Sequence, residues 1–337
     1  MSDIAVIALG GNALTREDQR GTVEEQYSNA LTMAKSVRSL LRRGWQIIIV
    51  HGNGPQVGNL AIQHEEGARL VPAQPLFSLG AMTQGALGSL ICLALHEVCG
   101  REISGAVSVV THIVVDRNDP AFAQPTKPIG PFFTEGEAQG FATARGWTMV
   151  ADAGRGFRRV VPSPTPQAIL EANAVAALTQ SGHIVVAAGG GGIPVIEENG
   201  AYRGVDAVID KDFAAERIAV AANANALVMV TGVLSVKLDF GTPQERSVEE
   251  LTVTEARRHL ADGQFPPGSM GPKMSAAIKF VEGSSSAERP RFAAITTPEL
   301  VYATLDEPHG VVEGHRGTRI LTEDVPTPAA TTKELVG

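Results

Sequence analysis

Three apolar runs in this chain end abruptly in glycine, and this repetition constrains the fold more than any other feature of the sequence. They are IAVIALGGN at residues 4–12, QIIIVHGNG at 46–54 and IVVAAGGGG at 184–192. A short apolar run closed by glycine is typical of a buried strand that turns sharply at its carboxyl end. Glycine leaves backbone N–H groups uncovered by any Cβ, so such turns can close around an anion. The pattern predicts a phosphate-handling enzyme.

Strand patterns and amphipathic helix patterns alternate along most of the chain, which favours a mainly parallel sheet covered by helices on both faces. We expect strands at residues 4–9, 46–51, 106–115, 183–188, 226–231 and 292–296. We expect helices at residues 23–43, 167–181, 211–222, 252–262 and 272–282. Because single cores stop growing at about 250–300 residues, a chain of this length can form one large α/β domain or two lobes, and we expect two lobes.

One segment, residues 116–166, breaks the alternation. It contains seven prolines and a single short helical pattern at about 134–145. A stretch this long without clear layers is usually functional. We therefore expect a small protruding subdomain that acts as a lid over the acceptor site. The tail from Glu323 is rich in small and polar residues, and we expect it to be flexible.

Charge and composition exclude several classes of protein. The net charge of −8 and the pI near 5.5 argue against a nucleic-acid binder. The N-terminus lacks the pattern of a signal peptide and no apolar run approaches the length of a membrane span, so we expect a cytoplasmic protein with no membrane partner. Cys92 and Cys99 match neither a zinc site nor a redox pair, and are expected to be buried thiols.

The segment HGNGPQVGN at residues 51–59 loosely resembles a dinucleotide-binding fingerprint. Pro55 interrupts the turn, however, and no acidic residue follows about 20 residues later, so a nicotinamide site is disfavoured. A glycine turn without any ligand stays open for this motif taken alone. The chain also lacks the G-x-x-x-x-G-K-[ST] phosphate loop and the protein-kinase signatures. A third phosphate-transfer architecture is needed.

Phosphoryl transfer requires cations around the developing charge, so lysines beside glycine or proline are the candidates. Lys127 lies between two prolines in PTKPIGP, and Lys211 follows Asp210 in the segment VIDKDF. Lys273 falls in the first turn of a predicted helix, where a cation is unfavourable unless an anion is also present. Taken singly, Lys127 could be a solvated loop lysine, and the acidic turn of Asp210 and Asp212 could be simple helix capping.

Other polar residues have simpler interpretations. Four side chains of DAGRGFRRVVPSP could contact an anionic ligand or tie the subdomain to the main body through ion pairs, and we favour ion pairs; they are Asp152, Arg155, Arg158 and Arg159. His51 and His112 lie at strand ends without visible metal partners, and we expect them to be structural.

Nine motifs, in order from about residue 4 to residue 320, together resemble the carbamate kinases of the amino-acid kinase superfamily. They are ALGGNA, HGNGPQVGN, GAMTQG, DPAFAQPTKPIGPF, DAGRGFRRVVPSP, GGGGIPV, AVIDKDFAAE, PGSMGPK and GTRI. The resemblance implies an α/β fold, a three-layer αβα sandwich around a mostly parallel sheet of about eight strands. It implies an acceptor half at residues 1–204, a nucleotide half at 205–322, and a homodimer.

The resemblance also implies roles for individual residues. The catalytic set would be Lys127, Lys211, Asp212, Lys273, Gly10, Gly11 and Asn12, with Asp212 organising the lysines. Substrate would be held by Gly52, Asn53, Gly54, Gly190 and Gly191. The nucleotide would contact Lys211, Thr231, Gly232, Val233, Phe240, Met270 and Lys273. The implied reaction is reversible phosphoryl transfer between ATP and carbamate, giving ADP and carbamoyl phosphate, with Mg²⁺ travelling with the nucleotide and no metal site of the protein's own.

Five positions depart from the family pattern: Phe77, Ser89, Leu234, Phe240 and Thr242. Phe77 and Ser89 lie in the acceptor half, so a kinase acting on a different small carboxylate or carbamate-like acceptor is an alternative. Phe240 can still stack on adenine, and the lysine missing at 242 would weaken nucleotide binding by only ~0–1 kcal/mol. A non-catalytic nucleotide-binding subunit is a third hypothesis, which the retained lysines argue against.

Overall fold

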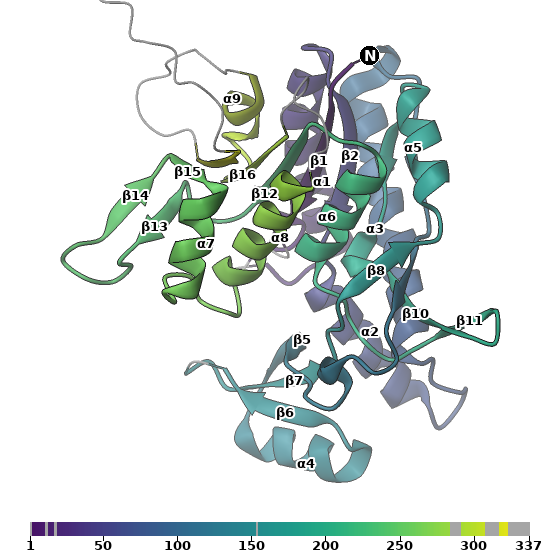
Figure 1. The fold of residues 1–337 in the computed structure, drawn as a ribbon. Coiled ribbons are helices and arrows are strands. Elements are labelled where there is room, and N and C mark those ends of the chain that lie inside the picture. The colour runs from purple at the N-terminus through teal and green to yellow at the C-terminus, as the bar shows by residue number, and fades with distance from the viewer. Residues whose placement is uncertain are drawn as a thin grey trace, which may run out of the picture.

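An eight-stranded sheet forms the centre of the molecule in the computed structural model, which describes residues 2–10, 13–16, 19–152, 154–283, 291–306 and 317–322 (Figure 1). The strand order is β15 (Glu250–Thr252), β17 (Thr318–Leu321), β16 (Phe292–Thr296), β12 (Ala226–Val230), β1 (Ile4–Leu9), β2 (Gln46–His51), β9 (Ile184–Val186) and β3 (Ala106–Ser108). Neighbouring strands are parallel except β16 and β17. The predicted mostly parallel sheet is confirmed.

Helices cover both faces of this sheet because side chains of its central strands alternate between two apolar clusters. In β1, Ala5 and Ile7 face one cluster, whereas Val6 and Ala8 face the other. The first face is covered by α1 (Val23–Leu41), α3 (Leu76–Cys99) and α9 (Val301–Asp306). The second face is covered by α5 (Ala172–Gln180), α6 (Lys211–Ala221), α7 (Val253–Ala261) and α8 (Met270–Glu282). The predicted three-layer sandwich is confirmed.

The strand predicted at 106–115 is wrong, because the chain leaves the central sheet between β3 and β4 (His112–Val115). The amide of Gln84 binds both backbone groups of Thr111 at this break, accepting from its N–H at 2.8 Å and donating to its carbonyl at 3.2 Å. A second sheet begins there. Its order is β11 (Ala201–Gly204), β10 (Ile193–Glu198), β4 and β8 (Pro166–Ile169).

The helix predicted at 167–181 starts later than expected, at Ala172. The preceding residues form β8, which pairs antiparallel with β4. Pro164 and Pro166 favour extended backbone there, since proline lacks an N–H and restricts the residue before it. Glu171 follows β8 in the chain. Its carboxylate accepts the backbone N–H of His112 at 2.7 Å and lies 2.8 Å from Nδ1 of the same histidine. His112 is thus structural.

A small α/β unit projects from the body below the second sheet (Figure 1). It consists of β5 (Lys127–Phe133), α4 (Glu135–Arg145), β6 (Thr148–Ala151) and β7 (Phe157–Val161), with strand order β5–β7–β6. We call it the lid subdomain, after the role expected for it from the sequence. The short helix predicted within this segment is confirmed as α4, but its three-stranded sheet was not predicted from the sequence.

The ion pairs expected to tie the lid subdomain to the body were assigned to the wrong residues. Arg155 pairs with Asp152 at 3.2 Å, inside the subdomain. Ion pairs that reach the body come instead from Arg145, which contacts Glu66 of α2 (Gly54–Gly67) at 3.0 Å, and from Lys127, which contacts Asp210 at 2.6 Å. Arg159 stacks over Trp147, 4.2 Å from the ring centroid, so this arginine packs the subdomain's own core.

The helix α3 is unusually apolar. By length and composition alone, Leu76–Glu102 is the one helix among the described residues that could cross a membrane. Its inner face nevertheless packs Leu87 and Leu95 against the sheet, as a core helix does. Cys92 and Cys99 are both free; Cys99 is buried, Cys92 is half-buried, and burial raises the pKa of Cys92 to about 11. The predicted flexible tail, residues 323–337, lies outside the described residues.

Candidate active site

Two predicted lysines meet on one carboxylate. Asp212 lies in the first turn of α6 and is only 3% exposed. Its Oδ1 atom accepts from Lys211 Nζ at 2.6 Å, and its Oδ2 atom accepts from Lys273 Nζ at 2.8 Å. Because Lys273 is in the first turn of α8, the carboxylate brings the N-terminal turns of two helices together. Such helix ends favour anions, and in this structure the anion at Lys273 is Asp212.

The charges of this cluster shift one another's pKa. Burial opposes the negative charge of Asp212, but the two lysines outweigh it and hold the pKa of this carboxyl well below its usual range. Burial likewise opposes the charge of Lys211, but the attraction of Asp212 and Asp210 raises its pKa. For Lys273, burial and repulsion from Lys211 lower the pKa in spite of Asp212.

Lys127 reaches the same helix end from the lid subdomain. Its Nζ atom lies 2.6 Å from Oδ2 of Asp210, whose Oδ1 atom accepts the backbone N–H of Asp212 at 2.9 Å. The residue that caps α6 thus also holds the lid lysine. Sequence reasoning treated Asp210 as a helix cap and missed this second contact, since its partner is 83 residues away. Three lysines and two aspartates leave the cluster with one net positive charge, which suits an anionic ligand.

In the glycine turns after β1 and β2, the backbone amides of Gly10 and Gly52 are already hydrogen-bonded within the sheet. The N–H of Gly10 donates to the carbonyl of Val230 at 3.1 Å, and that of Gly52 donates to Leu9 at 3.2 Å. Both amides therefore extend the sheet. Gly11 and Asn12 lie outside the described residues. Gly54 is the first residue of α2, directly after Asn53.

The four-glycine turn after β9 packs directly on the turn after β2. A Cβ at Gly189 would overlap the ring of His51, and one at Gly190 would overlap the side chain of Asn53. Asn53 in turn donates to Oγ1 of Thr83 at 2.8 Å. Gly191 has a positive φ of +91° and no room for a Cβ beside the carbonyl of Ile209. Close packing therefore requires these glycines, whether or not they also touch a ligand.

His51 is buried at the centre of this contact. Its Nδ1 atom lies 3.0 Å from the carbonyl of Gly52, while its Nε2 atom has no hydrogen-bond partner among the described residues. Burial lowers the pKa of this imidazole, so it is neutral at pH 7 and donates from Nδ1. The hydrogen bond of Nδ1 agrees with the expected structural role of His51. The unpaired Nε2 atom has no such explanation.

The predicted nucleotide residues fall into two groups. The segment Thr231–Val233 follows β12, at the side of the sheet where the carboxyl ends of β1 and β2 also lie. Met270 begins α8, one turn before Lys273. Phe240 is apart from them, in the turn between β13 (Val236–Leu238) and β14 (Arg246–Val248). The residue is 68% exposed, and Lys237 Nζ lies 6.0 Å from the centroid of its ring. This open ring face is free to stack.

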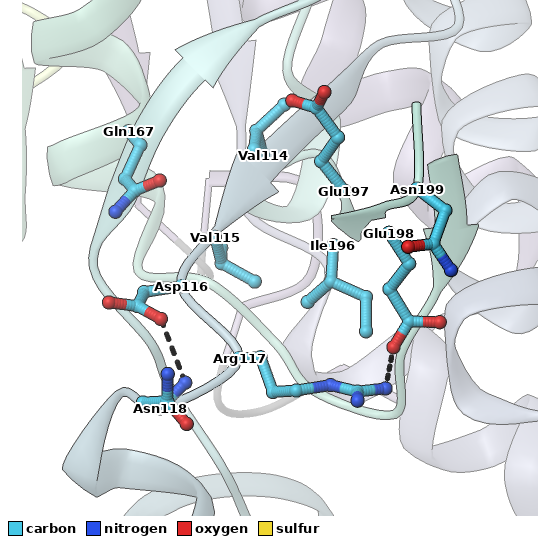
Figure 2. Close-up of a pocket in the computed structure, with 10 residues that line it drawn as sticks. All are labelled: Val114, Val115, Asp116, Arg117, Asn118, Gln167, Ile196, Glu197, Glu198 and Asn199. Carbon is cyan, nitrogen blue, oxygen red and sulfur yellow. Dashed lines mark hydrogen bonds and ion pairs between the residues drawn. The ribbon is translucent and has the colours of Figure 1, made fainter. Parts of the chain in front are cut away.

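A cavity of about 770 Å³ lies elsewhere, at the root of the lid subdomain (Figure 2). The chain enters the subdomain through Asp116, Arg117 and Asn118, which form one wall, and an ion pair between Arg117 and Glu198 crosses the opening. The lysine cluster does not line this cavity. Its lining residues are Val114, Val115, Asp116, Arg117, Asn118, Gln167, Ile196, Glu197, Glu198 and Asn199. The chemistry of the lysines, not the size of this cavity, marks the candidate active site.

The described residues contain no group of three His, Cys, Asp or Glu side chains placed to hold a metal ion. Both carboxylates of the cluster are already paired with lysines.

Comparison with known proteins identifies the family. The model of the amino acid kinase family matches residues 3–287. A carbamate kinase of Thermococcus kodakarensis is 44% identical, over 94% of this chain and 99% of the relative. A carbamate kinase-like protein of Escherichia coli is 41% identical, over 95% and 99%. The structure of carbamate kinase from Giardia lamblia bound to AMP-PNP superimposes with a TM-score of 0.84, at 36% identity over 96% of this chain and 99% of that one. The chain belongs to the amino acid kinase family.

Proposed function

We propose that this protein is a carbamate kinase that transfers a phosphoryl group reversibly between ATP and carbamate. The observation that carries the proposal is the lysine cluster. Asp212 holds Lys211 and Lys273 together, and Lys127 faces the same helix end from the lid subdomain. The full-length similarity to carbamate kinases supplies the substrate class.

The proposed reaction needs no protein nucleophile. In the direction of ATP synthesis, a β-phosphate oxygen of ADP attacks the phosphorus of carbamoyl phosphate, the bond between that phosphorus and the carbamate oxygen breaks, and carbamate leaves with the electron pair. Negative charge accumulates on the transferred group and the leaving oxygen. Lys211 and Lys273 would stabilise the charge on the nucleotide side, and Lys127 the charge on the acceptor side. Asp212 orients the first two lysines and does not itself react.

The magnesium ion is proposed to enter with the nucleotide. Bound there, it would offset part of the negative charge of the phosphates. The remaining predicted contacts are proposed with it. Gly10, Gly11, Asn12, Gly52, Asn53, Gly54, Gly190 and Gly191 would surround the transferred phosphoryl group. Thr231, Gly232, Val233, Phe240 and Met270 would surround the nucleotide. Residues 1–204 would then form the acceptor half and residues 205–322 the nucleotide half.

A different small carboxylate acceptor is the second candidate. Phe77 packs its ring against Gly204, where any Cβ would overlap the ring, and its backbone N–H lies 3.4 Å from Asp206 Oδ1. The side chain at this departure from the family pattern therefore contacts the segment that leads to Asp210. One relative is also named only carbamate kinase-like.

The deciding experiment is a coupled assay that follows ATP formed from ADP and carbamoyl phosphate with Mg²⁺ present. We expect turnover by the wild-type chain and none by Lys211→Ala. ATP formation no greater than that control would reject the carbamate kinase proposal. An acceptor screen that follows ATP consumption would then separate another kinase from a protein that binds nucleotide without turnover. Higher kcat/KM with another carboxylate than with carbamate would favour the second candidate.

We also propose a cytoplasmic homodimer that works in the catabolic direction, making ATP. The outer face of α3 supports the dimer because it exposes large apolar side chains that a second copy could cover. Leu93 is 55% exposed and Met82 is 42% exposed on this face. β3 beside it is the last strand of the sheet. Leu93→Glu is expected to convert a dimer to a monomer in sedimentation velocity. A monomeric wild-type chain would contradict the dimer.

A further inference from the structure

The backbones of α2 and β5 touch at two glycines. An ideal Cβ added to Gly58 would overlap the Cα and N atoms of Gly130 and lie 3.2 Å from the carbonyl carbon of Ile129. Gly58 lies one turn inside α2, and Gly130 lies in the middle of β5 with a φ of +73°. The lid subdomain therefore seats its first strand directly on the body at this point (Figure 1).

Helix geometry does not require a glycine at position 58. Glycine inside a helix costs about 1 kcal/mol relative to alanine. Gly58 does not have a positive φ, so its backbone conformation is one that residues with a side chain can also adopt. Gly67 offers a comparison on the same helix, because a Cβ there would meet nothing within 4 Å. The reason for glycine at 58 is the close approach of β5.

The strand is held from its other side as well. Arg158 Nη2 donates to the carbonyl of Gly130 at 2.9 Å. The side chain of Ile129 is buried in an apolar cluster with Val57 and Ala61 of α2. A Cβ at position 58 would therefore have to displace a strand that these contacts restrain. Restoring a normal carbon–carbon separation of about 3.5–4.0 Å requires a shift of more than about 1 Å.

Lys127 is the first residue of the same strand, three residues before Gly130. With β5 in this position, its Nζ atom lies 2.6 Å from Oδ2 of Asp210. We propose that Gly58 is a positioning residue whose missing side chain lets β5 place Lys127 at the lysine cluster. The inference rests on the proposed role of Lys127 in phosphoryl transfer. Misplacing a reacting group by about 1 Å can lower a rate by about 100-fold.

The kinetic test is a double-mutant cycle of Gly58→Ala with Lys127→Ala, with Gly67→Ala as the matched control. We expect Gly58→Ala to lower kcat about 10- to 100-fold and Gly67→Ala to leave it unchanged. If Gly58 acts through Lys127, the double variant is no slower than Lys127→Ala alone. Multiplicative losses in the double variant would overturn the inference, because Gly58 would then act on another part of the site.

A carbodiimide cross-link gives a readout independent of activity. The reagent joins a carboxylate to a neighbouring amine as an amide and leaves as the urea, taking up the water that is lost. We expect a Lys127–Asp210 cross-link by peptide mass spectrometry in the wild type and in Gly67→Ala, and its loss in Gly58→Ala. Retention of the link in Gly58→Ala would contradict the inference.

Two further outcomes separate this inference from the proposed function. If Lys127→Ala keeps full activity, the proposed role of Lys127 fails, whereas the cross-link still reports on the seat of β5. If Lys127→Ala is inactive and Gly58→Ala is fully active, only the positioning inference fails. Loss of far-UV circular dichroism in Gly58→Ala would also overturn it, since the glycine contact would then serve folding as a whole.

Discussion

Lys273 donates to Oδ2 of Asp212 at 2.8 Å although the two residues lie 61 positions apart, on α8 and α6. The other oxygen of the same carboxylate holds Lys211 at 2.6 Å. Each lysine ammonium thus pairs with its own oxygen of Asp212, and both lysine side chains are nearly buried. The carboxylate sets the spacing of the two cations, which is the property that a site for two bridged phosphates needs.

Asp212→Asn should damage both stability and activity. The amide keeps the shape of the side chain but leaves two buried lysines without the carboxylate that pairs with both. Breaking a buried ion pair on one side typically costs about 3–5 kcal/mol. We expect a loss of this order in the free energy of unfolding from urea titration, and loss of detectable ATP formation. Asp262→Asn, at the exposed C-terminal cap of α7, is the control. An unfolding free energy within ~0.5 kcal/mol of wild type would contradict the prediction.

The same carboxylate predicts a pH dependence. The native pKa of Asp212 lies below its usual range because of Lys211 and Lys273, so the folded state binds this proton more weakly than the unfolded state does. The stabilisation is therefore fully present above the ordinary carboxyl pKa and is lost as pH falls toward the native value. We expect the stability gap between wild type and Asp212→Asn to be constant from about pH 8 to 5 and to shrink below about pH 4. A gap that widens on acidification would contradict this.

The fold was largely predictable where a strand is fully buried. β1, β2, β12 and β16 match their predictions within a residue or so, because continuous apolar runs closed by glycine or polar residues have few other solutions. The strands of the lid subdomain were not predictable. β5 contains prolines and has an irregular register, and its pairing with β7 depends on chain that follows α4.

The site was predictable as a set of residue types but not as a set of partners. Lys127, Lys211 and Lys273 stood out because each lies beside a turn or a helix start. Asp210 did not, because a helix cap already gives it a complete local role. The reason for the glycine at 58 could not be predicted on similar grounds. A glycine is required there because β5 of the lid subdomain approaches closely, and the local sequence around residue 58 does not indicate that contact.

Asp210→Asn should separate binding from turnover. Asparagine is as good an N-cap as aspartate, so α6 should keep its first turn, and any loss of stability should come from the ion pair with Lys127. The cluster would gain one net positive charge, which should lower KM for carbamoyl phosphate. Lys127 would lose its partner, so kcat should fall about 10-fold.

The control for that prediction is Asp210→Ala, which removes the cap as well. It should cost about 1 kcal/mol more in unfolding free energy than the asparagine variant. Steady-state kinetics and urea titration on both variants measure the two effects. A kcat for Asp210→Asn equal to wild type would show that the ion pair with Lys127 has no part in turnover.

Two glycines with similar backbone angles allow a matched test of the four-glycine turn. Gly190 has a φ of +66° and no room for a Cβ beside Asn53, whereas Gly200, in the β10–β11 turn, has a φ of +77° and open space. Alanine at either position costs about 1–2 kcal/mol of backbone strain. Gly190→Ala must also push Asn53 away from Thr83, which leaves a buried amide unpaired and adds about 1–3 kcal/mol.

Urea titration should therefore rank Gly190→Ala well below Gly200→Ala in stability, and only Gly190→Ala should lose ATP formation. Equal losses for both variants would mean that backbone strain alone, and not the contact with Asn53, explains the glycine at 190.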